Sequence, residues 1–136
     1  MVRRVVADSS VWIDYFRDVD TRETAVLDAS IALDNASALL VVPDLVCYEV
    51  LAGASSEGVR RRIDRLMRGF EVVGLGGETA VVSAAARYRH LRRRGMTIRK
   101  SIDVLIASWC LDHDAALLHR DRDFEPFVDA FGLKTV

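Results

Sequence analysis

The feature that most constrains this chain is a short apolar run that ends in an acid. Residues 5–7, Val-Val-Ala, have the composition of a strand buried on both faces, and Asp8 follows directly. Ligands of open α/β sheets bind just beyond the carboxyl ends of the strands, so Asp8 is expected to point into a crevice. Ser9 or Ser10 is expected to cap a helix that begins near Val11. Alternatively, Asp8 only caps that helix, and this stretch alone does not distinguish the two.

Strand-like and helix-like segments alternate along the rest of the chain. Further buried strands are expected at residues 39–42 and 115–118, another strand at 70–73, and a closing edge strand at 133–136. Helices are expected at residues 11–17, 21–38, 45–52, from 55–57 to about 68, 79–94, 102–111 with Ser101 as its N-cap, and 125–131. This alternation predicts an α/β domain with a mainly parallel central sheet and right-handed crossovers.

Composition favours one globular domain spanning residues 1–136. With 51% hydrophobic residues, the chain can bury a core without disulfides or structural metals. Cys47 and Cys110 are too far apart in sequence for a zinc knuckle, and no apolar stretch has the length to span a membrane. We therefore expect a cytoplasmic protein with free thiols.

Four carboxylates fall where this topology brings strand ends and first helical turns to one edge of the sheet: Asp8, Glu49, Asp103 and Asp121. Each has a separate structural explanation, because acids are common at helix starts and a lone acid can reach water from one helix face. Together they would repel one another unless protonated or neutralised by cations. Hard divalent ions prefer oxygen ligands, and two-metal sites suit displacement at phosphorus, so this pattern predicts a Mg²⁺ site.

Four segments together resemble the signature segments of PIN-domain ribonucleases. They read VVADSSVWID (residues 5–14), PDLVCYEVL (43–51), IDVLIA (102–107) and LLHRDRDF (117–124). Within that family the chain is most similar to the VapC-type toxins of bacterial type II toxin–antitoxin pairs, over essentially its whole length. The resemblance implies a three-layer α/β/α PIN-like domain.

The resemblance also implies an endoribonuclease that binds Mg²⁺ or Mn²⁺. Asp8, Glu49, Asp103 and Asp121 match the acidic quartet of the family, and Asp123 matches an acid often present beside it. A metal-activated water would attack the phosphodiester and leave 5′-phosphate and 3′-hydroxyl ends. Ser10, and less clearly Ser9, matches a small hydroxyl position that orders the site. His119 departs from the family, whose members often carry threonine there; we expect it to perturb the surroundings of the metal ligands only.

The family further implies three kinds of partner: RNA, a VapB-like antitoxin and a second copy of the chain, giving a homodimer and a toxin–antitoxin hetero-oligomer. All but two of the 19 cationic residues are arginine, a side chain that binds phosphate bidentately. Candidates for RNA binding are Arg93, Arg94, Arg99, Lys100 and Arg120, although a solvated surface explains many such cations. An antitoxin groove would be formed by Trp12, Tyr15, Phe16, Val26 and Leu27, for which core packing is the competing explanation.

Two other functions are compatible with the sequence. One is a housekeeping or DNA-directed nuclease of the same fold. The other is a catalytically silent RNA-binding or regulatory module, which the presence of all four acids disfavours. The RNA sequence that is cleaved, and the number of metal ions, do not follow from the sequence.

Overall fold

A parallel sheet lies at the centre of the structure, a computed structural model that describes residues 3–37 and 40–136. Within these residues the sheet has four strands in the order β3-β2-β1-β4. The strands are β1 (Val5–Ala7), β2 (Leu40–Pro43), β3 (Glu71–Val73) and β4 (Ala116–Leu118). Every pairing is parallel, with Val6 opposite Val41 on one side and Leu117 on the other. The predicted parallel sheet is therefore confirmed. Because β1, β2 and β4 are buried on both faces, their sequences are continuous apolar runs.

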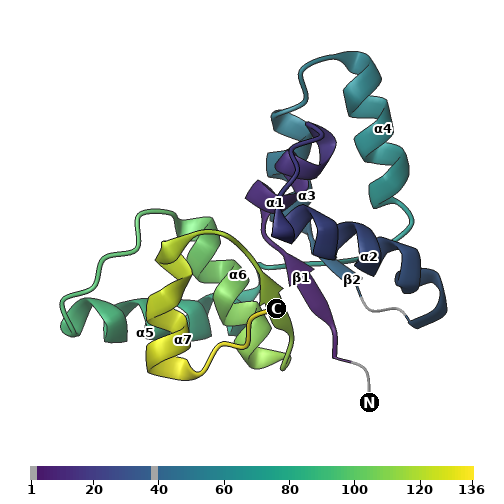
Figure 1. Cartoon of the computed structure of the whole chain (residues 1–136). Coiled ribbons are helices and arrows are strands. Elements are labelled where there is room, and N and C mark those ends of the chain that lie inside the picture. Colours follow the sequence, from purple (N-terminus) through teal and green to yellow (C-terminus); the bar gives the residue numbers. More distant parts are fainter. Residues whose placement is uncertain (1–2, 38–39) are drawn as a thin grey trace.

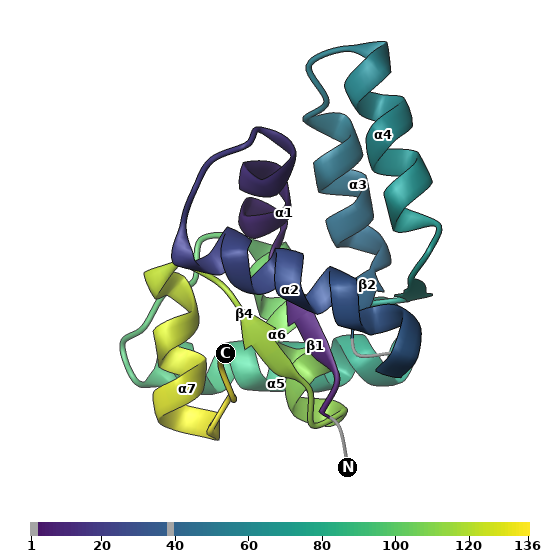
Figure 2. The same cartoon turned by 45° about the vertical axis from the view of Figure 1, so that its right-hand side comes forward.

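Helices cover both faces of this sheet. They are α1 (Ser9–Phe16), α2 (Arg22–Ser37), α3 (Asp44–Ala52), α4 (Glu57–Met67), α5 (Glu78–Arg93), α6 (Ser101–Asp112), the short 3₁₀ helix η1 (Arg122–Phe124) and α7 (Glu125–Phe131). In Figure 2, α2 crosses in front of the sheet while α5 and α6 lie behind it, and the α3–α4 pair projects beyond the upper end. The three-layer α/β/α prediction is thus confirmed. No helix of residues 3–37 and 40–136 combines the length and apolar character needed to cross a bilayer.

The order of the strands creates a switch point beside β1. From β1 the chain moves outward to β2 and then β3, and it later returns to place β4 on the other side of β1. The connections that leave β1 and β4 therefore diverge at the carboxyl edge (Figure 2), where β1 continues into α1 (Figure 1). Crevices at such points are the usual ligand sites of open parallel sheets.

Trp12 and Phe16 of α1 belong to the core, which resolves one alternative left open by the sequence. Trp12 is fully buried, Phe16 is 6% exposed, and their rings stack with centroids 6.0 Å apart. Leu27 of α2 is also fully buried. These three side chains cannot line an open groove for a partner, whereas Tyr15 and Val26 remain partly accessible. The excess of apolar residues in α1 arises because this helix packs against α2 and α3 together.

Three local predictions were wrong. Neither Ser9 nor Ser10 is the N-cap of α1, because the helix starts at Ser9 and Asp8 holds the cap position. Ser101 is likewise the first residue of α6, not its cap. The expected strand at 133–136 is reduced to a single bridge between Leu117 and Thr135. That segment follows α7 and Gly132, which has a left-handed φ of 72°, and it pairs with β4 only at Leu117.

The turn that ends α5 fixes where the loop toward α6 begins. Gly95 has a φ of 83°, a left-handed conformation, and the next amide, of Met96, donates to the carbonyl of Leu91 at 2.9 Å. This is the predicted glycine at the C′ position of the helix. Side chains with a Cβ are strained in this conformation.

Gly95→Ala is therefore expected to lower the free energy of unfolding by about 1 kcal/mol, measured by urea denaturation. Gly76→Ala is the matched control, because a Cβ there meets open space and its φ is not in the left-handed range. It should change stability by less than about 0.5 kcal/mol. Equal effects at both glycines would show that α5 does not need this turn.

Candidate metal centre

Neighbouring elements bring carboxylates to the switch point. Asp8 follows β1, and its amide donates to the carbonyl of Leu118 at 2.9 Å, which ties the end of β1 to the end of β4. Asp121 follows β4 at the same edge. Asp103 lies in the first turn of α6, a helix that packs against β4 and η1. The parallel arrangement therefore gathers acids that are up to 113 positions apart in the sequence.

Asp103, Asp121 and Asp123 form the tightest part of this group. One carboxylate oxygen from each lies within 4.8 Å of the others. The backbone explains the pairing of Asp121 with Asp123: Asp121 caps η1, and its Oδ1 accepts a hydrogen bond from the amide of Asp123 at 2.9 Å. Asp123, which the sequence matched less firmly than the other acids, thus sits beside two members of the quartet.

Burial of unpartnered oxygens indicates that the group suits a cation. Asp8 and Asp103 are each only 4% exposed. Oδ1 of Asp8, Oδ2 of Asp103 and Oε1 of Glu49 are buried without a hydrogen-bond partner within residues 3–37 and 40–136. A buried acceptor with no donor is costly, and a divalent ion with oxygen ligands removes that cost for several carboxylates at once. The residues present therefore fit a Mg²⁺-type ion.

The same crowding changes the acidity of the buried carboxyls. Burial, followed by the charge of Asp8, raises the pKa of Asp103 to about 7, while Lys100 opposes the shift and Asp121 and Glu49 add to it. Burial likewise raises the pKa of Asp8, against the hydrogen bond from Ser10. All four acids of the quartet are therefore close enough to interact electrostatically around Asp103.

Asp8 is not an ordinary helix cap. Although it occupies the cap position of α1, its side chain makes no capping hydrogen bond. Its Oδ2 instead accepts a hydrogen bond from the Ser10 hydroxyl at 2.6 Å, while its Oδ1 has no hydrogen-bond partner in the part of the chain that the structure describes. The predicted ordering role of Ser10 thus has a concrete partner, namely Asp8. Ser9 is 8% exposed and lies beside them at the start of α1.

Glu49 and His119 lie at the periphery of the group. The charge of Glu49, on α3, helps to raise the pKa of Asp103. Glu49 is not one of the three residues whose carboxylate oxygens lie within 4.8 Å of one another. The ring of His119 packs on Phe124 with centroids 4.8 Å apart, and its Nδ1 is buried without a partner among the described residues. His119 contributes no ligand atom to the set of three.

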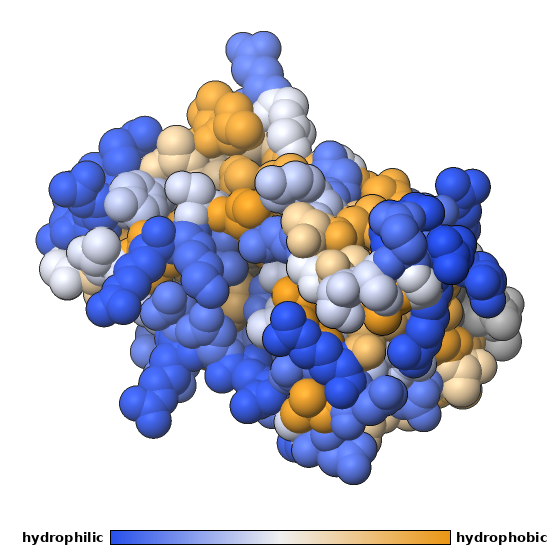
Figure 3. Space-filling model, turned by 90° about the horizontal axis from the view of Figure 1, so that it is seen from above, coloured by the Kyte–Doolittle hydropathy of each residue, from blue (hydrophilic) through white to orange (hydrophobic). Residues whose placement is uncertain are grey.

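The candidate RNA-binding cations are all exposed, but they are differently placed. Lys100 precedes α6, and its charge reaches Asp103. Arg93 and Arg94 lie at the end of α5, and Arg99 lies in the loop that follows. Arg120 borders the acidic group directly. Seen from above, hydrophilic side chains and hydrophobic patches surround a hollow between the two halves of the molecule (Figure 3).

A cavity of about 530 Å³ adjoins the acidic group, lined by Ser10, Asp14, Arg120, Asp121 and Arg122. Asp14 and Arg122 were not among the residues selected from the sequence. A signal for Asp14 was present, because it lies four positions after Ser10 and so on the same helix face. Its partner, Arg120, is 106 positions away, and only the fold reveals the pair.

Comparison with known proteins identifies the family. The model of the PIN domain family matches residues 5–127. This chain is a PIN-domain protein. It is 31% identical over 121 residues to the VapC ribonuclease Mb1587 of Mycobacterium bovis and to Ribonuclease VapC11 of Mycobacterium tuberculosis, a stretch that covers 89% of this chain and 89% of each relative. The resemblance to VapC-type members of the family is therefore confirmed.

Solved structures show the same PIN fold at lower sequence identity. VapBC2 from Rickettsia felis, bound to a promoter DNA fragment, superposes with a TM-score of 0.72 at 14% identity, covering 100% of this chain and 98% of the other. DNA-bound VapBC from Salmonella typhimurium superposes with a TM-score of 0.67 at 13% sequence identity, covering 100% of this chain and 98% of the other. A toxin–antitoxin complex from Klebsiella pneumoniae superposes with a TM-score of 0.63 at 20% sequence identity, covering 97% of this chain and 95% of the other. At these identities the likeness establishes the fold.

The raised pKa of Asp103 makes the stability of the metal-free PIN domain depend on pH. The folded state holds a proton on this carboxyl up to about pH 7, whereas the unfolded chain releases it near its ordinary value of 3.8. The free energy of unfolding should therefore fall as pH rises through this window.

Asp103→Asn removes the ionisable group, so with a chelator present it should stabilise the protein on the order of 2 kcal/mol at about pH 8 and hardly at all near about pH 4. The measurement is urea denaturation at both pH values. Asp114→Asn, at an exposed acid paired with Lys134 at the opposite end of β4, is the control and should not stabilise at high pH. A loss of stability in Asp103→Asn at high pH would contradict the burial argument.

Proposed function

We propose that this PIN domain is a metal-dependent endoribonuclease that acts in the cytoplasm as the toxin of a VapBC-type pair. The observation that carries the proposal is the set of carboxylate oxygens of Asp103, Asp121 and Asp123 within 4.8 Å, beside buried unpartnered oxygens of Asp8 and Glu49. The relatives named VapC ribonuclease support the activity, and the neighbours that are VapBC complexes support the toxin role.

Asp8, Glu49, Asp103, Asp121 and Asp123 would hold Mg²⁺, with Mn²⁺ as an alternative. When bound, such an ion supplies Lewis-acid activation of water and neutralises charge that develops on the phosphodiester during hydrolysis. Asp103 must lose the proton that burial stabilises on it before it can act as a ligand. The Ser10 hydroxyl holds Oδ2 of Asp8 and so directs Oδ1 toward the group.

Cations around the acidic group would hold the RNA backbone. Lys100 is the cation whose charge reaches Asp103, so it lies near the path of a scissile phosphate. Arg93, Arg94 and Arg99 extend this positive surface along the end of α5 and the following loop. Because phosphate contacts carry little sequence information, the shape of the groove would determine which RNA is cleaved.

Cleavage of single-stranded RNA by the purified protein tests this proposal. Cleavage is expected with Mg²⁺ or Mn²⁺, and no cleavage is expected with a chelator. Asp8→Asn and Asp121→Asn should each lower kcat by at least about a hundredfold, because each removes the charge of a metal ligand. Asp114→Asn is the matched control, since it removes an exposed acid at the opposite end of the sheet. Equal cleavage by wild type and Asp8→Asn would overturn the metal-nuclease assignment.

Cleavage assays on RNA and DNA, together with expression in cells, separate the alternative functions. A DNA-directed or housekeeping nuclease would cleave DNA, or would cleave RNA without arresting growth when expressed. A silent regulatory module would bind RNA and leave it intact. Inducing the wild type and Asp8→Asn in bacterial cells should therefore arrest growth only with the wild type.

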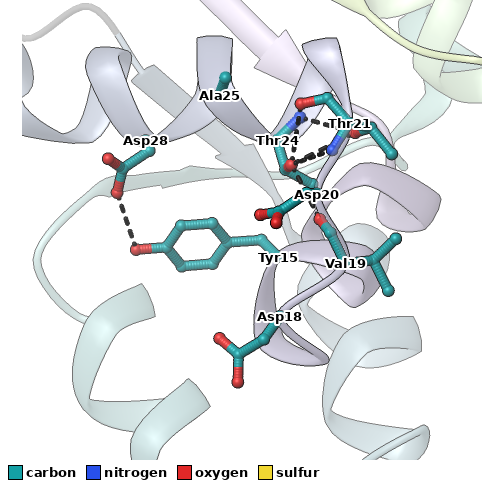
Figure 4. A pocket seen from close by; sticks show the side chains of 8 residues that line it. All are labelled: Tyr15, Asp18, Val19, Asp20, Thr21, Thr24, Ala25 and Asp28. Carbon is teal, nitrogen blue, oxygen red and sulfur yellow. Dashed lines mark hydrogen bonds between the residues drawn. The ribbon is translucent and has the colours of Figure 1, made fainter.

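A VapB-like antitoxin would contact α1 and α2, although not through the buried aromatic residues. A cavity of about 500 Å³ lies there, with Tyr15 from α1 reaching toward Asp28 of α2 at 3.4 Å (Figure 4). Asp18, Asp20 and Asp28 border it, and within residues 3–37 and 40–136 none of them forms an ion pair. This negative cavity suits a basic side chain of a partner.

A homodimer would use the groove between α5 and α6. Its lining is mostly apolar, over a cavity of about 240 Å³: Val81, Ala84, Ala85, Tyr88, Ser101, Val104 and Leu105. Val81 is 44% exposed and the adjacent Val82 is 63% exposed. Exposed apolar side chains gathered in one groove favour contact with another protein surface.

Val81→Asp is expected to shift the protein from dimer to monomer, because a carboxylate buried at the contact would lack a partner. The measurement is mass by light scattering after size exclusion. Val136→Asp is the control, as Val136 is similarly exposed, at 39%, but lies outside the groove. A wild-type protein that is monomeric at high concentration would contradict the dimer.

A further inference from the structure

An ion pair crosses the mouth of the acidic group. Nη1 of Arg120 donates to Oδ2 of Asp14 at 2.6 Å, joining the loop after β4 to the face of α1 that also carries Ser10. Both residues line the 530 Å³ cavity that continues to Asp121, the residue directly after Arg120. The lining of the cavity thus includes a candidate metal ligand, Asp121, and a guanidinium that is held by an ion pair.

Stability does not explain this pair. The side chains are 46% and 23% exposed, and ion pairs with that much access to water contribute little to folding. Arg120 has five N–H donors, and within the described residues only the bond from Nη1 is formed. Arg120 also lines the cavity. A guanidinium that is held on one side and free on the other is preorganised to bind a second oxyanion.

We propose that Arg120 binds the RNA phosphate adjacent to the one that is cleaved, and that Asp14 is a positioning residue that holds the guanidinium in place. This inference rests on the proposed nuclease function. Asp14 also keeps Arg120 from turning onto the neighbouring carboxylate of Asp121, where it would compete with a metal ion. The ligand class is a phosphodiester in a single-stranded RNA backbone.

The two roles of Asp14 predict opposite results for one substitution. If Asp14 acted only through its charge, Asp14→Asn would strengthen RNA binding, because a negative charge beside the phosphates is removed. If Asp14 orients Arg120, Asp14→Asn weakens binding despite that gain. The direction of the change therefore distinguishes positioning from simple electrostatics.

The test is steady-state RNA cleavage at several salt concentrations with the wild type, Asp14→Asn, Arg120→Gln and the double variant. Arg120→Gln should raise KM about tenfold with little change in kcat, as expected for a lost charged hydrogen bond. It should also lower the slope of log(1/KM) against log salt by about 0.7, the value for one phosphate contact on a single strand. Asp14→Asn should raise KM about threefold or more, and Arg120→Lys should restore the slope.

The KM of the double variant should be no higher than that of Arg120→Gln alone, because Asp14 positions only Arg120 and the loss of its negative charge otherwise favours RNA binding. Lys134→Gln is the control, since it removes an exposed cation from an ion pair with Asp114, away from the cavity, and its KM should equal that of the wild type. Three results would each overturn the inference while the wild type still cleaves RNA. They are a lower KM in Asp14→Asn, an unchanged salt slope in Arg120→Gln, and a KM increase in the double variant that equals the product of the two single increases. A wild type that neither binds nor cleaves RNA would overturn the proposed function, and this inference with it.

Discussion

Mutual repulsion among buried carboxylates is the constraint on which the functional face depends. Asp8 and Asp103 are almost fully buried, and the charges of Asp8, Asp121 and Glu49 all act on Asp103. In the absence of a cation, burial and then these neighbouring charges raise the pKa of Asp103 to about 7, which keeps a proton on its carboxyl group. A bound divalent ion would reverse that preference. The same feature thus links stability, pH and metal binding, because each depends on how much negative charge the edge of the sheet carries.

The strand order is what brings this charge together. β1 lies between β2 and β4, so the chain turns in opposite directions after β1 and β4 and leaves a crevice at their shared carboxyl edge. A core of large buried side chains, including Trp12, Phe124 and Phe127, holds α1 and η1 in place around that crevice. Trp12 and Phe16 of α1 therefore belong to the core and are not available to a partner.

Positive charge is distributed differently at the two ends of the sheet. At the amino end, Arg4 pairs with Glu71 and Lys134 pairs with Asp114, which accounts for those cations structurally. At the carboxyl end, Arg120 is held by Asp14 beside a cavity that leads to the acidic group. In the proposed function, Arg120 would bind the backbone of a polyanion and the carboxylates would act at a separate position in the same crevice.

The sequence alone determined the α/β fold, the parallel sheet and the acids that gather at its edge. It could do so because buried strands are continuous apolar runs, and because an acid at the end of such a run, as at Asp8, is a local pattern. Only the tertiary structure decided that Trp12 is core, that 133–136 forms one bridge, that Asp123 joins Asp103 and Asp121, and that Asp14 meets Arg120. Those outcomes depend on packing and on contacts between residues far apart in the chain, which no local pattern records.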